Sequence, residues 1–148
     1  MQQGTLELVS REITIDFPIE QVKSAMKEIF DRKPGTYQVR PKDINDVFNT
    51  YHFAIAKGLQ CGIVDITLTK TDNVKTTISC KISNAYGAIA SNSILSGLLN
   101  DYLNVLAKVL TGDKSDLPKP GEPGSNSGCM VIMAIGISSL LLMAFTLL

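Results

Sequence analysis

The chain holds few residues whose type and spacing suit catalysis. Its single histidine, His52, lies between Tyr51 and Phe53, and a catalytic base would also need a nucleophile and an orienting carboxylate close by. Asp43 and Asp46 are neighbouring carboxylates, but their segment has the composition of a polar turn. We therefore interpret His52 as a histidine on a sheet face or at the surface.

Sites for phosphate or metal are not indicated either. Gly58, Gly62 and Gly87 lack both the spacing and the lysine of a phosphate-binding loop. The three cysteines are too widely spaced for a set of metal ligands. Tyr86 lies in a small, partly apolar loop, where it would either line the mouth of a pocket or fill the edge of the core. The sequence thus predicts a protein that is not an enzyme and uses no metal or cofactor.

The charges of the chain balance, with 14 basic and 14 acidic residues. A neutral protein has no electrostatic field that would recruit nucleic acid, so we expect no nucleic-acid partner. Without its apolar end the chain has about 110 residues, which is enough for one compact core and too few for two domains.

The most apolar segment is Cys129–Leu148, which contains no charged residue. As a helix it would measure about 30 Å, which matches the hydrocarbon core of a bilayer. We predict a single transmembrane helix that anchors the chain. Ala134, Gly136 and Ser138 are small residues that let helices pack closely, so a homodimer formed through this segment is an alternative to their ordinary occurrence in spanning helices.

The rest of the chain is expected to lie in the cytosol. Residues 1–17 alternate polar and apolar side chains and include acidic ones, which is not the pattern of a signal peptide. Lys108, Lys114 and Lys119 all precede the apolar segment, as the positive-inside rule requires. Asp113–Gly128 is rich in proline, glycine and serine and predicts a flexible linker that follows a domain over residues 1–112.

The first half of the domain reads as a strand, a helix and further strands. Residues 5–17 alternate and predict a strand, and an amphipathic helix begins at Pro18. A short strand over Thr36–Arg40 is expected to end at Pro41. Residues 43–56 fit either a helix or a strand, and their aromatic content favours the strand.

The next segment predicts a hairpin. Gly62–Lys70 and Val74–Ser83 alternate polar and apolar side chains and are expected to turn at Asp72-Asn73, which gives a sheet with one buried and one wet face. Cys61 and Cys80 have opposite parity in these strands, so we expect no disulfide bond between them.

The clearest helical periodicity is in Ser91–Thr111, which has one broad apolar face. Ser91 or Ser93 would cap its N-terminus, and Gly112 lies where a left-handed C-terminal cap belongs. Two amphipathic helices and one half-wet antiparallel sheet bury each other's apolar faces. We therefore predict an α+β fold, a two-layer sandwich of a curved antiparallel sheet and a long C-terminal helix, followed by the transmembrane helix.

This order of elements resembles the helix-grip fold of START-like (Bet v 1-like, SRPBCC) domains, in a small version that covers residues 5–110. The resemblance is carried by the opening strand that runs into Pro18–Val22, by the Gly62–Leu68 strand with its Lys75–Thr77 partner, and by the final helix. The usual domain is longer and has more strands. A short sheet that the final helix closes completely is therefore the alternative to a ligand cavity.

The resemblance implies a cavity for an apolar ligand between the long helix and the sheet. The residues assigned to line this cavity are Tyr51, Phe53, Tyr86, Leu95, Leu99 and Tyr102. We expect a membrane-tethered, non-enzymatic module that binds an apolar small molecule or a protein partner. The alternative is a structural or assembly subunit of a membrane complex, in which the apolar tail packs against other helices.

Overall fold

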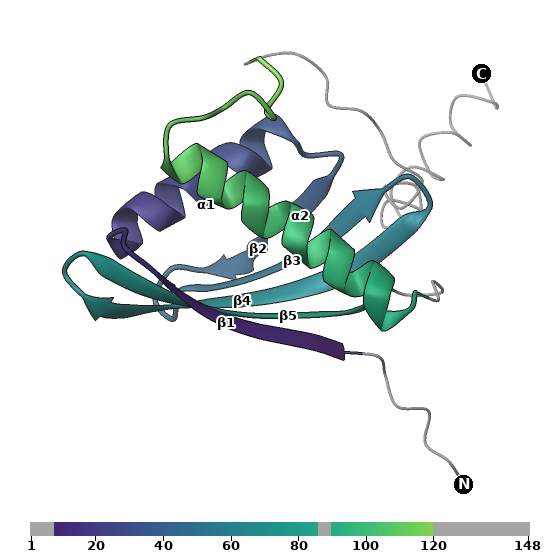
Figure 1. Ribbon diagram of the computed structural model, residues 1–148, viewed down its shortest axis with the longest axis horizontal. Helices are drawn as coiled ribbons and strands as arrows, with labels where there is room; N and C mark the ends of the chain where they lie inside the picture. Colours follow the sequence, from purple (N-terminus) through teal and green to yellow (C-terminus); the bar gives the residue numbers. More distant parts are fainter. Residues whose placement is uncertain (1–7, 86–89, 120–148) are drawn as a thin grey trace, which may run out of the picture.

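The computed structural model describes residues 8–85 and 90–119, which form a five-stranded antiparallel sheet with two helices on one of its faces (Figure 1). The strand order is β1-β5-β4-β3-β2, so the first two strands of the chain are the two edges of the sheet. The elements are β1 (Leu8–Ile15), α1 (Ile19–Arg32), β2 (Tyr37–Asn45), β3 (Thr50–Lys57), β4 (Gln60–Asp72), β5 (Lys75–Asn84) and α2 (Asn92–Leu110).

Alternating side chains set the register of the sheet. Val64 of β4 lies opposite Ile82 of β5, and both are fully buried under the helices. Their neighbours Asp65 and Lys81 also lie opposite each other, but on the outer face, where both are exposed. The predicted division into a buried and a wet face is confirmed, because a slip of one residue would turn every apolar side chain to water.

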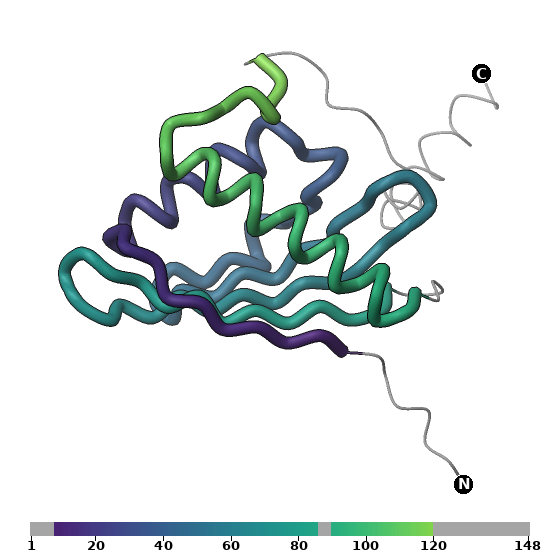
Figure 2. The backbone as a smooth tube through the Cα atoms, in the orientation of Figure 1, coloured from purple at the N-terminus to yellow at the C-terminus, as the bar shows by residue number. Residues whose placement is uncertain are grey.

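The long helix α2 has the caps that its sequence predicts. The Ser91 hydroxyl accepts a hydrogen bond from the Ile94 backbone N–H at 3.3 Å, and Gly112 adopts the left-handed conformation with φ +89°. The helix lies across the covered face of the sheet (Figure 2) and buries Leu95, Leu99 and Tyr102 completely. The two-layer α+β sandwich is therefore confirmed for the described residues.

Polar contacts near both edges of the sheet hold α2 in place. Near one edge, the Arg11 guanidinium of β1 donates hydrogen bonds to the side-chain oxygens of Ser96 and Asn100. Nearer the other edge, Lys57 of β3 forms an ion pair with Asp101 at 2.6 Å. The helix is thus fixed across the strands as well as packed on them.

The strand β2 is longer than predicted. It runs through Pro41 to Asn45, with a shift in its pairing to β3 between Val39 and Ile44. A proline is tolerated there because β2 is an edge strand and the irregular pairing removes the need for the missing N–H group.

Residues 43–56, whose sequence fits either a helix or a strand, form the end of β2, a turn and most of β3. The favoured strand is confirmed for Thr50–Lys57, but Val47 and Phe48 lie in the turn, where they are 82% and 71% exposed. The Asn45 side-chain oxygen accepts hydrogen bonds from the backbone N–H groups of both residues. Their apolar character reflects neither a buried helix face nor a buried strand face.

The hairpin of β4 and β5 turns one residue later than predicted. Asp72 pairs with Lys75, so the loop consists of Asn73 and Val74, and Val74 is exposed rather than part of the buried face. The Asp72 side chain accepts a hydrogen bond from the Val74 backbone N–H at 2.8 Å, which stabilises the turn in this register.

The two cysteines of the sheet lie on opposite faces, as predicted. Cys80 is a free, buried thiol opposite Ile66 on the face that the helices cover. Cys61 pairs with Ala56 and has the parity of the outer-face residue Asp65. A disulfide bond between Cys61 and Cys80 is therefore excluded by geometry.

Folded contacts extend beyond residue 112. Leu117 is buried in the main core, and Lys114 and Asp116 form ion pairs with Glu28 and Lys108 at 2.9 and 2.8 Å. Residues 113–117 thus contact the domain, although they belong to the predicted linker. Residues 8–85 and 90–119 contain no helix that is long and apolar enough to cross a membrane. The predicted transmembrane segment, Cys129–Leu148, lies outside the described residues.

Candidate functional site

A groove opens between α2 and the edge of the sheet formed by β2 and β3. Its volume is about 490 Å³, within the range of about 300–1,000 Å³ that is common for small-molecule sites. We call it the α2 groove. Buried side chains with apolar surface form its floor, namely Tyr37, Ile55, Leu98 and Val105. Charged side chains form its rim, namely Lys33, Lys57, Asp101, Lys108 and Asp116.

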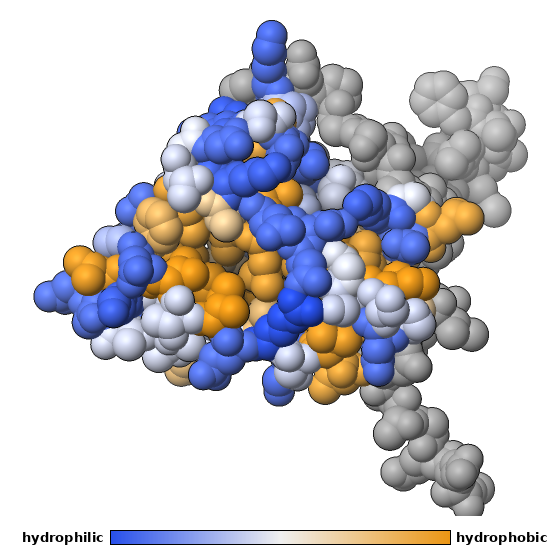
Figure 3. Space-filling view, viewed as in Figure 1, coloured by the Kyte–Doolittle hydropathy of each residue, from blue (hydrophilic) through white to orange (hydrophobic). Residues whose placement is uncertain are grey.

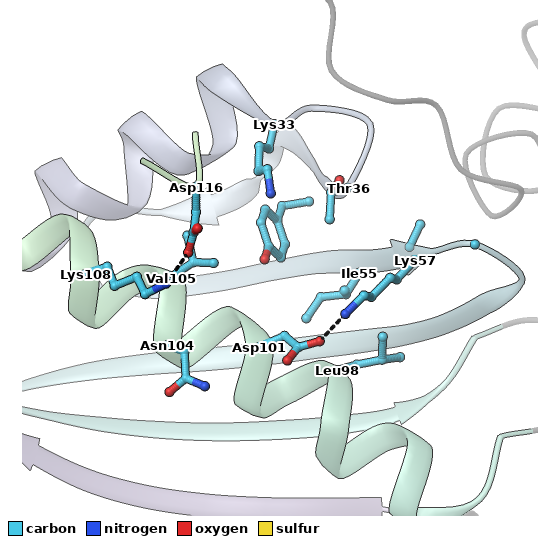
Figure 4. A pocket seen from close by; sticks show the side chains of 13 residues that line it. Lys33, Thr36, Ile55, Lys57, Leu98, Asp101, Asn104, Val105, Lys108 and Asp116 are labelled. Carbon is cyan, nitrogen blue, oxygen red and sulfur yellow. Dashed lines mark hydrogen bonds and ion pairs between the residues drawn. The ribbon is translucent and has the colours of Figure 1, made fainter. Parts of the chain in front are cut away.

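Two ion pairs cross the rim of the α2 groove (Figure 4). Lys57 binds Asp101 at 2.6 Å and so connects β3 to α2. Lys108 binds Asp116 at 2.8 Å and connects α2 to the segment that follows it. Both pairs are largely exposed, and such pairs contribute at most about 1 kcal/mol each, so the rim can open at little cost.

Beneath the groove lies a cluster of five aromatic rings. The Tyr37 ring, which belongs to the groove floor, meets the Tyr102 ring edge-on with their centres 5.1 Å apart. The centre of the Tyr102 ring is also 5.0 Å from the centre of the Phe53 ring, and the ring stacks on Phe30 with their centres 6.4 Å apart. Tyr51 completes the cluster through its contact with Phe30. We call these five residues the aromatic cluster.

The Tyr102 hydroxyl is a buried polar group without a partner. Tyr102 is fully buried, and its hydroxyl forms no hydrogen bond with any described residue. Leaving such a group unpaired costs about 1–3 kcal/mol. Burial raises the pKa of this phenol well above its ordinary value, so the hydroxyl keeps its proton and can donate it to a ligand atom.

Tyr37, the member of the aromatic cluster that lines the α2 groove, is also uncharged at neutral pH. Burial, together with the nearby carboxylates of Asp101 and Asp116, raises the pKa of Tyr37 to about 12. The Asp116 carboxylate accepts a hydrogen bond from Lys108 and raises the pKa of that ammonium group. The α2 groove therefore combines neutral phenols below with stable charges above.

A second groove, of about 570 Å³, lies between α1 and the edge strand β2. We call it the α1 groove. Phe30, Val39, Ile44 and Tyr51 supply its apolar surface, and charged residues of α1 surround it. Phe30 and Tyr51 belong to the aromatic cluster, so the cluster separates the two grooves. Figure 3 shows a strip of hydrophilic residues crossing this face of the molecule, with hydrophobic residues visible on both sides.

The structure brings most of the predicted lining residues together, though in different roles. Tyr51, Phe53, Leu95, Leu99 and Tyr102 all belong to the main hydrophobic core. Tyr51 lines the α1 groove, while Phe53 and Tyr102 lie within the aromatic cluster between the grooves. Leu95 and Leu99 line neither groove, because the sheet packs directly on them. Tyr86 lies outside the described residues.

Sequence reasoning missed the residues that line the α2 groove. Lys33, Tyr37 and Val105 come from the end of α1, the start of β2 and the middle of α2. Asp101 is a charged residue of the long helix, as expected for a side chain in water, and its ion pair with Lys57 of β3 shows that it borders a groove. The available signal was Tyr37, an aromatic residue just after a helix-ending Lys-Pro-Gly segment.

His52 lies on the outer face of the sheet, away from both grooves. Its Nδ1 atom is 2.6 Å from the Asp65 carboxylate of the neighbouring strand, and both side chains are substantially exposed. Neither residue lines the α1 groove or the α2 groove. The placement of His52 at the surface is therefore confirmed.

The fold can be compared with known proteins. No family model matches the sequence, and no curated protein matches it. Ara h 8.0201 has a similar crystal structure, with a TM-score of 0.52 and 14% identity over 75% of this chain and 99% of that one. ZhuI aromatase/cyclase from Streptomyces sp. R1128 matches with a TM-score of 0.50 and 9% identity, over 80% and 100% of the two chains.

A further solved structure agrees with these two. An uncharacterized protein from Bacillus thuringiensis matches with a TM-score of 0.50 and 12% identity, over 70% of this chain and 98% of that one. Identities this low support a shared fold and nothing finer. Together with the sheet order and the long final helix, they show that the chain has the helix-grip fold of START-like (Bet v 1-like) domains.

Proposed function

We propose that this domain is a non-enzymatic module that binds an apolar small molecule in the α2 groove. The observation that carries this proposal is the Tyr102 hydroxyl, which is buried and has no partner among the described residues, on a ring that packs edge-on against Tyr37 of the groove floor. A ligand atom that accepts its hydrogen bond would relieve the cost of about 1–3 kcal/mol that the free protein bears.

The route to this hydroxyl passes the Tyr37 ring. Tyr37 lines the groove and packs edge-on against Tyr102. Rotation of that ring would connect the groove with the aromatic cluster, and the ligand would then cover Ile55, Leu98 and Val105. Each 100 Å² of apolar surface that leaves water contributes about 2.5 kcal/mol before the costs of association.

Two features support binding rather than catalysis. The described side chains that line the α2 groove include no histidine, cysteine or serine, the usual bases and nucleophiles. Two of the three rim lysines form ion pairs with carboxylates, and a lysine engaged in this way is a poor nucleophile. The similar aromatase/cyclase does not alter this proposal, since its identity to this chain is only 9%.

We also propose that Cys129–Leu148 tethers the module to a membrane, with the domain in the cytosol. The support is the uncharged sequence of that segment. The nine residues between Lys119 and Cys129 reach about 30 Å when extended, so Lys119 would stay within about that distance of the bilayer surface. Deletion of Cys129–Leu148 should move the protein from carbonate-washed membranes to the soluble fraction. Retention in the membranes would show that another segment is the anchor.

The ligand proposal is tested by native mass spectrometry of the full chain after gentle purification from cells. We expect a bound apolar molecule on the parent protein and its loss in Val105→Phe, because the larger side chain fills the groove. Val109→Phe is the matched control, since Val109 is equally buried on the same helix but does not line the groove. A parent protein without bound ligand, or equal loss in both variants, would contradict the proposal.

A further inference from the structure

We propose that the ligand of the α2 groove is an amphipathic carboxylate, with its apolar part on the groove floor and its carboxylate at the ammonium group of Lys33. This inference rests on the proposed function and adds the chemical class of the ligand to it. Its basis is the distribution of charge around the rim of the groove.

Lys33 is placed at the rim by the end of α1. Its backbone N–H donates a hydrogen bond to the Ile29 carbonyl oxygen at 2.9 Å, which fixes the residue as the C-terminal cap of the helix. Figure 4 shows the Lys33 side chain extending from the connection between α1 and β2 toward the cavity. Among the described residues, no carboxylate forms an ion pair with its ammonium group.

The other charges of the rim are already paired. Lys57 is bound to Asp101 and Lys108 to Asp116, at 2.6 and 2.8 Å. The groove lining therefore has a net charge of +1, and this charge is centred on Lys33. An anionic head group would neutralise it without breaking either ion pair, whereas a cationic head group would be repelled.

The apolar surface lies in the right place for such a ligand. Ile55, Leu98 and Val105 supply the apolar atoms of the groove floor. They are almost fully buried in the free protein, so the apolar chain of the ligand reaches them when the Tyr37 ring rotates. Lys33 is half-buried at the rim, so its ammonium group is partly shielded from water and its attraction to a carboxylate is stronger than that of a fully exposed lysine. A compound with one carboxylate at Lys33, and an apolar chain that carries one oxygen atom to accept the Tyr102 hydrogen bond, satisfies the rim, the floor and that hydroxyl.

The test compares two probes of equal length, octanoate and octan-1-ol. Binding of each to the full chain in detergent is measured by isothermal titration calorimetry, with a titration into protein-free detergent subtracted. The variant is Lys33→Gln, which keeps the length and polarity of the side chain but removes its charge. Lys42→Gln is the matched control, since Lys42 is an exposed lysine of β2 that lines neither groove.

We expect the parent protein to bind octanoate about tenfold more tightly than octan-1-ol, because a hydrogen bond to a charged group adds about 1.5 kcal/mol or more. Lys33→Gln should abolish this preference and leave the affinity for octan-1-ol unchanged. Lys42→Gln should retain the preference.

Each other outcome overturns one specific statement. Equal affinity for the two probes in the parent protein, or a preference for octanoate that persists in Lys33→Gln, would overturn the role of Lys33 but leave an apolar site in place. Failure of both probes to bind the parent protein would overturn the proposed function itself, and the inference with it. A loss of preference in both variants would show a general effect of net charge and would also overturn the role of Lys33.

Discussion

Removing the Tyr102 hydroxyl should have opposite effects on stability and on ligand binding. Tyr102→Phe deletes one oxygen atom that is fully buried and has no partner among the described residues. The ring itself remains in its contacts with Phe30, Tyr37 and Phe53. The ligand-free variant should therefore be more stable than the parent by about 1–3 kcal/mol, the cost of an unpaired buried polar group.

Thermal unfolding of the ligand-free protein measures this effect. Each kcal/mol corresponds to a rise in Tm of about 4–8 °C for a domain of roughly 100 residues. The same variant should bind octan-1-ol about two- to tenfold more weakly, because the alcohol oxygen loses its hydrogen-bond donor. Tyr37→Phe is the control, since the Tyr37 hydroxyl is not a buried unpartnered group, and it should not raise Tm.

A lower Tm for Tyr102→Phe would refute the reasoning. It would mean that the hydroxyl already has a partner in the free protein, such as a bound water. Unchanged affinity for octan-1-ol would separately show that the ligand does not reach the aromatic cluster.

Three further predictions concern the core. Leu99→Asp places an unpaired charge at a fully buried position and should cost several kcal/mol, on the order of the whole stability; a Tm within a few degrees of the parent would contradict the packing of α2. Gly62→Ala should destabilise the fold by about 1–3 kcal/mol, because the new methyl group would lie 2.6 Å from the Cδ1 atom of buried Ile82. Gly97→Ala meets open space and should stabilise α2 by about 0.5–1 kcal/mol. Chemical denaturation that gives the two variants the same stability would contradict this. Because burial raises the pKa of both Tyr37 and Tyr51 to about 12, the folded state holds these protons more tightly than the unfolded state, so the stability they contribute is complete below about pH 10 and is lost as the pH rises toward 12. Circular dichroism and phenolate absorbance should then change together in that range, and early ionisation of all four tyrosines without unfolding would contradict it.

Much of the fold could be predicted because periodicity reports burial directly. The apolar face around Leu99 and the alternation of the strand that contains Val64 each specify one element and one buried side. Val47 and Phe48 could not be placed in the same way, because their apolar character fits a turn tip, a helix and a strand alike. The long β2 strand was missed because Pro41 normally ends a strand, and its tolerance at an edge depends on neighbours that the local sequence does not identify.

The candidate site was less predictable, because it depends on contacts between distant segments. The aromatic residues Phe53 and Tyr102 were assigned to a ligand cavity through the resemblance, but nothing in the sequence shows that the Tyr102 hydroxyl lacks a partner. The rim of the α2 groove consists of charged residues that are indistinguishable from a solvated surface until Lys57 and Asp101 are found 2.6 Å apart. Such pairing is a property of the tertiary structure.

The most direct test of ligand binding in the α2 groove is a titration of the full chain with octan-1-ol, followed by the methyl NMR signals of the core. Ile55, Leu98 and Val105 line the groove. Leu68 does not: it lies on β4, six residues and therefore about 20 Å along the strand from Gly62, which pairs with Ile55. Saturable shifts of the methyl groups of these three groove residues, with the Leu68 methyl groups unchanged, are the predicted result. Shifts spread evenly over the core, or none at the groove residues, would contradict the account.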